Sequence, residues 1–469
     1  MFLAAFLVVA GAAVAFLLVQ GGGDGVDHPD TWDPRVEDLV AFVEDERDLD
    51  FEHPVEIEFL AERAFREEVT SDAADLTDEE RREIEAFTGT MRALGLIEGD
   101  VDLFEELNTL TGEGVLAFYS VEDQRVVVKG ETLDTPTKVT LVHELTHALQ
   151  DQHFGLGLIE DPPEDATDGE LFAYRALGEG DAGRIEVAYL ESLPAAEQEE
   201  YAQFEEEGLE ELESNTSDVP PVLEVFMGAP YALGDLFVAV LDEEGGNDAV
   251  DDAFRDPPTS DEHLLDPWTY LDDDDPERVP VPGLPGGEEE IDSGDFGALT
   301  WYLVLAERID LTRALEAVDG WGGDSYVVSV DDGRPCVRAV FEGETDADAD
   351  EMESALAAWN EAGAKASADI RRTGKRVILH SCDPGADAAG EVRGHSEAAL
   401  GVPLFRGYIT LGGVQEGAPV DFSRCYASEI VDGLDQEQLL TLEEWLGAEE
   451  EPPGFAALAE SAARACIGT

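Results

Sequence analysis

The chain of 469 residues is strongly acidic: Asp and Glu number 110 against 27 Lys and Arg, and the formal net charge at pH 7 is −83. This charge excludes proteins that bind nucleic acids or anionic membranes by neutralising phosphates. Hydrophobic residues make up 43% of the chain, more than acidic disordered tails carry, so we expect a folded protein.

The negative charge is spread over every segment, and only four of the 27 basic residues are lysine. A compact particle with this charge repels itself unless ions screen it, and at molar salt the Debye length is about 3 Å. We interpret the chain as adapted to high salt, the alternative being an ordinary acidic surface. Dialysis from molar KCl into millimolar buffer should therefore remove secondary structure, measured by circular dichroism. An unchanged spectrum would contradict this interpretation.

The N-terminal segment, residues 2–19, is an uncharged apolar run that is followed by Gly-rich and then acidic chain. Its length fits a membrane-spanning helix or a secretory signal. The lack of a small-x-small cleavage pattern and of a lipid-acceptor Cys favours a retained anchor. We therefore predict an anchor or signal with a linker over residues 1–25, a cell-membrane location, and a body that lies outside the cell.

The first half of the sequence predicts a small α+β segment followed by long helices. Residues 35–49 have helical apolar spacing, residues 54–60 alternate as a strand, and a helix over residues 77–94 begins with the capping-box residues Thr77 and Glu80. A β-hairpin and a series of helices follow; the hairpin strands are 115–120 and 125–129, and the helices are 135–153, 168–193, 195–214, 220–241 and 246–254.

In the second half, residues 257–287 are irregular, with Pro and Asp throughout, and residues 295–318 are helical. Short strands then alternate with helices; the strands are 326–330, 336–341 and 376–380, and the helices are 348–362, 423–434 and 455–466. We predict an α+β fold with a mainly helical domain over residues 34–324 and a smaller C-terminal α+β unit over residues 325–469.

The four Cys residues all lie in the last third of the chain. An even number in a chain expected outside the cell favours two disulfides over free thiols, and the lack of a Cys-x-x-Cys pair argues against a zinc site. Cys336 and Cys382 flank predicted strands, whereas Cys425 and Cys466 lie on predicted helices. Of the three possible connectivities we therefore predict 336 with 382 and 425 with 466.

The sequence His143-Glu144-Leu145-Thr146-His147 lies within the predicted helix 135–153. Residues i and i+4 of a helix point in directions about 40° apart, so both imidazoles can share one metal ion. Glu144 is turned sideways, toward the open coordination position. Because the chain has only 8 His, chance explains this motif poorly. The motif predicts a zinc hydrolase in which His143 and His147 bind the metal and Glu144 faces the open position.

A zinc site needs a third protein ligand. His153 has the spacing of a metzincin ligand, but that motif needs Gly where this chain has Gln150, and on a continuous helix His153 points away from His147. Glu179 on the next helix is the better candidate, because small neighbours would let the two helices approach closely. The alternative is that Glu179 is one solvated acid among many.

Other residues near the motif are weaker candidates. Asp151 could orient a ligand imidazole, and His263 and Tyr270 could stabilise a developing oxyanion. The strand 125–129 could pair with an extended peptide substrate. An ordinary structural role is the alternative for each of them.

Several motifs together resemble one family: the stretch from His143 to Phe154, and residues 114–119, 175–182, 257–260 and 320–326. That family consists of largely uncharacterised surface proteins of haloarchaea and some bacteria. It is similar to the gluzincin, thermolysin-like metallopeptidases in its HExxH helix and its downstream Glu. The likeness covers about residues 36–345.

The resemblance implies a zincin-like fold for residues 34–324 and one Zn²⁺ bound by His143, His147 and Glu179. It also implies that Glu144 is the catalytic base and that the substrate is a peptide or protein, with no nucleic-acid partner. Asp266 stands before Pro where a His is expected; if that His assists turnover, either His263 substitutes for it or the activity is weakened.

The alternative function is a non-catalytic cell-surface protein with a structural metal site. A closed site with four protein ligands, for example His153 together with Glu179, would favour that alternative. A third hypothesis, a structural component of the cell envelope, predicts no bound metal.

Overall fold

A computed structural model of the chain describes residues 28–467, except 72, 75, 159–161, 164–165, 218, 287, 332, 364–367, 389–391 and 443–453. The expected N-terminal anchor lies outside the described residues and stays a prediction. Within them, one helix, α8 (Pro221–Gly245), is long and apolar enough to cross a membrane, but 72% of its apolar stretch is buried in the protein. Such burial is what a core helix shows.

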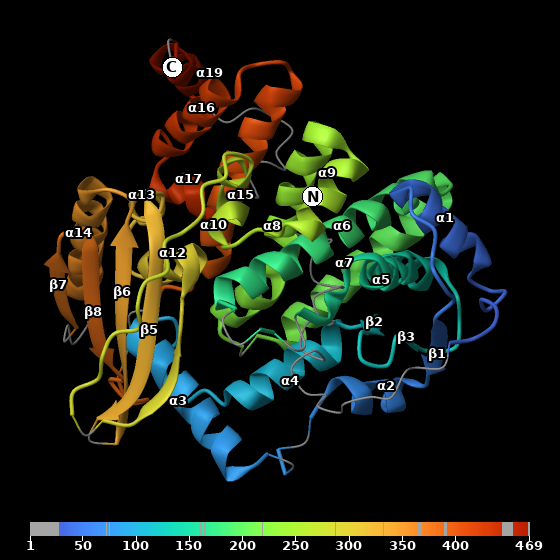
Figure 1. Cartoon of the computed structure of the whole chain (residues 1–469), viewed down its shortest axis with the longest axis horizontal. Coiled ribbons are helices and arrows are strands. Elements are labelled where there is room, and N and C mark those ends of the chain that lie inside the picture. The colour runs from blue at the N-terminus through green and yellow to red at the C-terminus, as the bar shows by residue number, and fades with distance from the viewer. Residues whose placement is uncertain are drawn as a thin grey trace.

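The described chain has an α+β fold, as predicted (Figure 1). Its strands form two sheets: β1 (Glu56–Leu60), β2 (Ala117–Ser120) and β3 (Arg125–Lys129) in the smaller one, and β4 (Glu290–Gly294), β5 (Trp321–Asp331), β6 (Arg334–Gly343), β7 (Asp369–Thr373) and β8 (Arg376–Cys382) in the larger one. The helices of the first half are α1 (Glu37–Arg47), α2 (Glu62–Val69), α3 (Asp78–Leu94), α4 (Leu103–Gly114), α5 (Thr135–Phe154), α6 (Asp168–Ser192), α7 (Ala195–Asn215), α8 and α9 (Asn247–Arg255). The later helices are α10 (Glu262–Leu265), α11 (Pro267–Leu271), α12 (Gly297–Ala306), α13 (Leu311–Glu316), α14 (Asp346–Ala362), α15 (Ser396–Gln415), α16 (Val420–Asp432), α17 (Gln436–Leu440) and α19 (Phe455–Ala465).

The smaller sheet has the order β1-β3-β2, with β1 parallel and β2 antiparallel to β3. The suggestion that the strand 125–129 pairs with a peptide substrate is therefore wrong. This strand is β3, whose backbone bonds to a neighbour on each side and whose residues Val126, Val127 and Val128 are fully buried. Strand β2 is an edge strand of the described sheet, and it lies next to helix α5.

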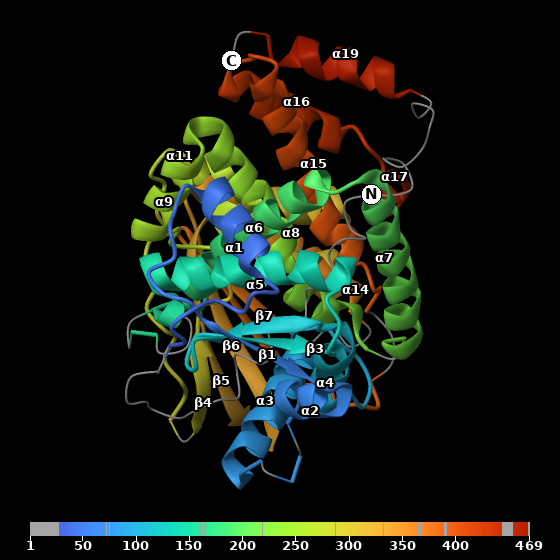
Figure 2. The ribbon, with the colours of Figure 1, turned by 90° about the vertical axis from the view of Figure 1, so that its right-hand side faces the viewer.

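Helix α6 lies between α5 and α8 (Figure 2). The close approach that we expected from its small residues occurs mainly toward α8. A Cβ atom on Gly180 would lie 2.2 Å from the carbonyl oxygen of Gly234, and one on Gly234 would lie 2.1 Å from that of Ala176. These contacts give the mid-helix glycines a packing reason that outweighs their cost in helix stability.

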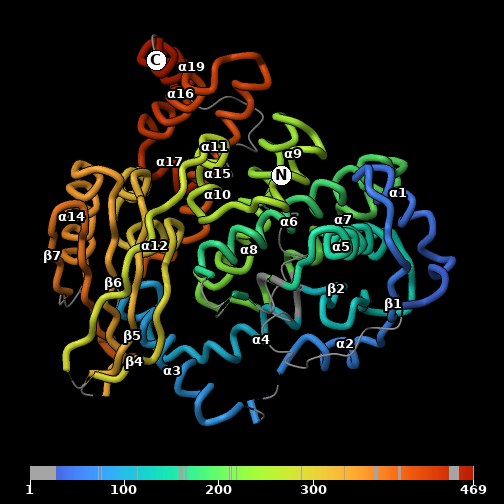
Figure 3. The backbone as a smooth tube through the Cα atoms, viewed as in Figure 1, coloured from blue at the N-terminus to red at the C-terminus, as the bar shows by residue number. Residues whose placement is uncertain are grey.

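The larger sheet is antiparallel in the order β4-β5-β6-β8-β7, with α3 and α14 packed against it. Figure 3 shows it beside the helical part, with α16 and α19 at one end of the molecule. One hydrophobic core joins the two parts, and it includes Trp301 of α12, Phe341 of β6 and Met91 of α3. The predicted boundary at residue 325 falls inside β5. The division into domains stays a prediction.

Some elements differ from the expectations. The helix expected over residues 295–318 is two helices, α12 and α13, separated by a turn around Asp310. The segment 257–287, expected to be irregular, contains the short helices α10 and α11, and the sequence pattern also did not predict α2, α4, α15, α17, β4 and β7. Two of these, β4 and β7, are the edge strands of the larger sheet, and their sequences, Glu-Ile-Asp-Ser-Gly and Asp-Ile-Arg-Arg-Thr, are too polar to show a strand pattern.

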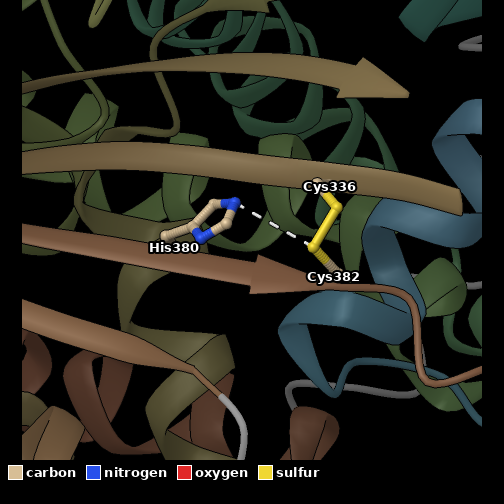
Figure 4. A group of neighbouring side chains, drawn as sticks. All are labelled: Cys336, His380 and Cys382. Atoms are coloured by element: carbon tan, nitrogen blue, oxygen red, sulfur yellow. Dashed lines mark hydrogen bonds between the residues drawn. A yellow bond between two sulfur atoms is a disulfide. The ribbon is translucent and has the colours of Figure 1, made fainter. Parts of the chain in front are cut away.

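Both predicted disulfides are formed. Cys336 and Cys382 are direct partners on β6 and β8, and Cys425 of α16 is bonded to Cys466 just after α19. Nε2 of His380 lies 3.9 Å from Sγ of Cys382 (Figure 4). These three residues are spaced like a metal site, but both sulfur atoms are used in the disulfide. They therefore provide no thiolate ligands in this form of the protein.

Candidate metal centre

Helix α5 holds the HExxH motif in a buried position. The helix begins with a cap in which the side chain of Asp134 accepts a hydrogen bond from the amide of Thr137, and Pro136 stands in its first turn. His143 and Glu144 are almost fully buried, at 1% and 0% exposure. The two motif imidazoles leave one face of the helix, and their Nε2 atoms are 3.0 Å apart.

Glu179 on α6 completes a three-residue cluster. Its Oε2 atom lies 3.3 Å from Nε2 of His143 and 3.3 Å from Nε2 of His147. The structure thus brings together the three residues that the sequence analysis selected as metal ligands. Close packing of α6 on α5 achieves this, since the residues lie 36 positions apart in the chain.

The outer nitrogen of each imidazole has its own acceptor. Nδ1 of His143 is 3.0 Å from a carboxylate oxygen of Glu186, and Nδ1 of His147 is 2.9 Å from Oε1 of Gln150. The amide of Gln150 is oriented by its NH₂ group, which donates to the carbonyl of Gly178 and to the carboxylate of Asp181. Both Nδ1 atoms must therefore carry the hydrogen, because oxygen acceptors face them.

This assignment leaves two Nε2 lone pairs and one carboxylate oxygen directed at the same point. Three acceptors at 3.0 to 3.3 Å repel one another unless a cation lies between them. In a tetrahedral zinc site with bonds of about 2.0–2.1 Å, ligand atoms are about 3.3 Å apart. Two imidazoles and one carboxylate with an open fourth position are also the ligands of catalytic zinc. The residues fit a zinc ion.

The pKa shifts of the cluster residues also indicate a site for a cation. Burial by itself would lower the pKa of His143, but the carboxylates of Glu179 and Glu186 outweigh it and raise that pKa well above its usual value. Burial likewise disfavours ionised Glu179, yet His147 and His143 hold its pKa well below the usual range. The site therefore attracts a positive charge, which a proton or a metal ion can supply.

Glu144 lies beside the cluster and does not belong to its ligands. Burial raises the pKa of its carboxyl, while the two histidines and the backbone amide of Tyr119 on β2 act in the opposite direction. Neither carboxylate oxygen makes a hydrogen bond of normal geometry within the described part of the chain. A buried carboxylate without such a partner next to a metal site is available for proton transfer.

Tyr231 of α8 is a site residue that the sequence analysis missed. Its ring is nearly parallel to that of His143, with centroids 6.3 Å apart. Burial first, and then the charges of Glu179 and Glu144, raise the pKa of its hydroxyl well above the usual value. Tyr231 stands in an apolar helix without a motif, and only the packing of α8 on α6 places it here.

A buried ion-pair network holds the side chain of Gln150, which bonds to His147. Arg47 of α1 is fully buried and bonds to Asp181, at 3.0 Å, and to Asp251 of α9. Asp181 also accepts from Gln150 and from Arg184. Since Gln150 in turn bonds to His147, the network links the imidazole of His147 to helices α1, α6 and α9. Gln150 and Glu186 thus have the orienting role that we expected of Asp151.

The expected role of Asp151 is wrong, and the structure also places His153 elsewhere. Asp151 accepts hydrogen bonds from the hydroxyl of Tyr119, at 2.8 Å, and from the amide of Leu156. Nε2 of His153 is 2.8 Å from the carbonyl oxygen of Asp50, at the protein surface. A continuous helix through residue 154 turns His153 away from the cluster, as its spacing indicated.

The suggested oxyanion residues are engaged outside the cluster. Nε2 of His263 lies 2.9 Å from the carbonyl oxygen of Asp274, and the hydroxyl of Tyr270 donates to the carbonyl oxygen of Asp256. Asp266, which stands where a His was expected, is paired with Arg424 at 2.6 Å. The contacts in the described chain connect none of these three residues to the cluster.

Comparison with protein-family models, with curated proteins and with solved structures gives no match for this chain.

Proposed function

We propose that this protein is a zinc metallopeptidase with a gluzincin-like centre. The observation that carries the proposal is the convergence of His143, His147 and Glu179 beside the buried carboxylate of Glu144. Metal binding alone would explain the three converging atoms. It would not require a fourth, buried carboxylate without a hydrogen bond of normal geometry in the described chain.

In this mechanism His143, His147 and Glu179 hold the metal. A zinc ion held by these residues would supply a bound water of lowered pKa and a positive charge that polarises a carbonyl group. Glu144 takes the proton of the attacking water and passes it to the leaving amine, and its buried position beside the ligands suits it to this role. The buried hydroxyl of Tyr231 donates to the substrate oxygen that gains negative charge.

The edge strand β2 is the proposed support for the substrate backbone. Among the described strands it pairs with β3 alone, and its residue Tyr119 faces the carboxylate of Glu144 with its backbone amide. An extended peptide can add to such an edge through backbone hydrogen bonds. This arrangement would place the peptide bond beside the base.

The alternative, a structural metal site on a non-catalytic surface protein, has less support. A structural zinc site has four protein ligands, and His153, the fourth ligand that it would need, is bonded to Asp50. We also propose that the protein acts outside the cell and is attached to the membrane by residues 1–25. The two disulfides support exposure to an oxidising environment.

Removal of the metal tests the proposed function. Dialysis against a zinc chelator in molar KCl should abolish cleavage of an unstructured, fluorescently labelled protein, and added Zn²⁺ should restore it because the ligands remain in place. Mg²⁺ should not restore it, since Mg²⁺ prefers oxygen ligands. Cleavage that continues unchanged after zinc removal, or no cleavage by protein that contains one zinc per chain, would contradict the proposal.

A further inference from the structure

A large apolar cavity lies outside the metal centre, between helix α3, the N-terminal half of α6, the start of α8, and strands β4 and β5. Its volume is about 800 Å³, within the range of about 300–1,000 Å³ that holds a whole small ligand. Most of its wall is apolar, and the larger apolar side chains are Phe87, Phe172, Phe226, Ile291, Phe296 and Leu299.

The cavity lies beside the metal centre along one face of α6. Phe172 and Arg175 line the cavity, and Glu179 follows Arg175 by one helical turn. Nε of Arg175 lies 3.8 Å from Oε1 of Glu179. At 1.5 Å per residue, the lining residues Arg175 and Asp168 stand about 6 and 16 Å from Glu179 along the helix axis. The cavity therefore begins next to the proposed ligand and extends away from it.

Arg175 brings a hydrogen-bond donor to this cavity. It lines the cavity with a side chain that is 24% exposed, and its guanidinium approaches Glu179 only to 3.8 Å. Two acids of the cavity wall are already engaged: Asp295 accepts from the amides of Asp168 and Gly169, and Asp292 accepts from the hydroxyl of Tyr326. The exposed part of the Arg175 side chain can therefore donate to an acceptor of a ligand.

The opening of the cavity exposes apolar surface. Phe87 lines the cavity and is 50% exposed, so it lies where the cavity meets solvent. A single exposed apolar side chain is ordinary at a protein surface, but here it continues the apolar wall of the cavity out to solvent. The lining thus fits an occupant with an apolar body and an acceptor near Arg175.

We infer that this cavity selects the substrate: it receives an apolar segment of the polypeptide, while Arg175 donates a hydrogen bond to a backbone carbonyl of that segment. This inference rests on the proposed peptidase function. An extended peptide advances about 3.3 Å per residue, so the distances of about 6 to 16 Å correspond to residues about two to five positions from the cleaved bond. Substrates are therefore unstructured polypeptides with Leu or Phe at those positions, on one side of that bond.

Binding to the zinc-loaded Glu144→Gln variant tests this inference without turnover. Fluorescently labelled ten-residue peptides with Leu and Phe at those positions should bind at least about tenfold more tightly than matched peptides with Ser, measured by anisotropy in molar KCl. A further Phe87→Asp exchange should remove most of this difference, because it places a charge at the opening. Ile467→Asp is the matched control: Ile467 is 76% exposed on the C-terminal segment, and its exchange should change nothing.

The outcomes separate this inference from the proposed function. Equal binding of Leu/Phe and Ser peptides, or equal effects of Phe87→Asp and Ile467→Asp, would overturn the inference. The inference would also be overturned if a fatty acid displaced the peptide and Phe87→Asp weakened the binding of the fatty acid but not that of the peptide, because the cavity would then hold the fatty acid. Cleavage of the labelled protein without apolar preference would remove the inference but leave the peptidase function. Apolar peptides that bind selectively to zinc-loaded wild-type protein without being cleaved would support the cavity and remove the peptidase function.

Discussion

The Glu144→Gln variant should bind zinc like the wild type and cleave peptides at least about 10²–10⁴-fold more slowly. The carboxylate of Glu144 is outside the ligand set, so its exchange for an amide of the same shape leaves the three ligand atoms in place. An amide cannot take a proton from the attacking water at neutral pH. Zinc content by elemental analysis and the cleavage rate of a labelled unstructured protein in molar KCl measure the two effects.

The matched control for this variant is Glu131→Gln, which makes the same exchange at an exposed position just before α5. It should retain both zinc and activity. If Glu144→Gln cleaves as fast as the wild type, Glu144 is not the base. If it loses zinc while its circular dichroism spectrum is unchanged, then Glu144 belongs to the ligands and the proposed geometry is wrong.

Removal of the third ligand should have the opposite effect on the metal. Glu179→Ala should bind zinc at least about 100-fold more weakly, because two imidazoles alone hold the ion poorly and even changes outside the ligand set cost about 10–100-fold. Activity should fall with zinc occupancy and should return in part at high added zinc. Competition with a chromogenic zinc chelator measures the affinity, and the cleavage assay measures the activity.

Glu191→Ala is the matched control, since Glu191 lies on the same helix but is exposed at its C-terminal end. It should bind zinc normally. His153→Ala should also retain zinc, because that side chain faces Asp50. A Glu179→Ala protein with full zinc affinity, together with zinc loss in His153→Ala, would show that the third ligand was assigned to the wrong residue. Circular dichroism excludes the case in which a variant is simply unfolded.

The sequence by itself determined the elements that carry strong local signals. The HExxH spacing placed two imidazoles on one face of α5, the capping pattern of Thr77 and Glu80 is present at the start of α3, and both disulfide pairs are formed as predicted. These features depend on helix periodicity, on local hydrogen bonds and on which elements the Cys residues flank. Such information is contained in a few neighbouring residues.

Glu179 could be selected from the sequence because small residues beside it indicated close helix packing and because the family resemblance implied a downstream Glu ligand. The partner of that packing differed from the expectation, since Gly180 contacts Gly234 of α8. In a chain with 110 acidic residues, a carboxylate carries little information until its neighbours in space are known. The distances of 3.3 Å to both imidazoles are a property of the packed helices.

Only the tertiary structure decided what surrounds the metal ligands. Gln150 rather than Asp151 orients His147, because the side chain of Asp151 is turned toward Tyr119 and the amide of Gln150 is held by Asp181. Tyr231 and the apolar cavity come from packing between helices and strands that are far apart in the sequence. Contacts of this kind depend on the long-range packing of side chains, which leaves no periodic pattern along the chain.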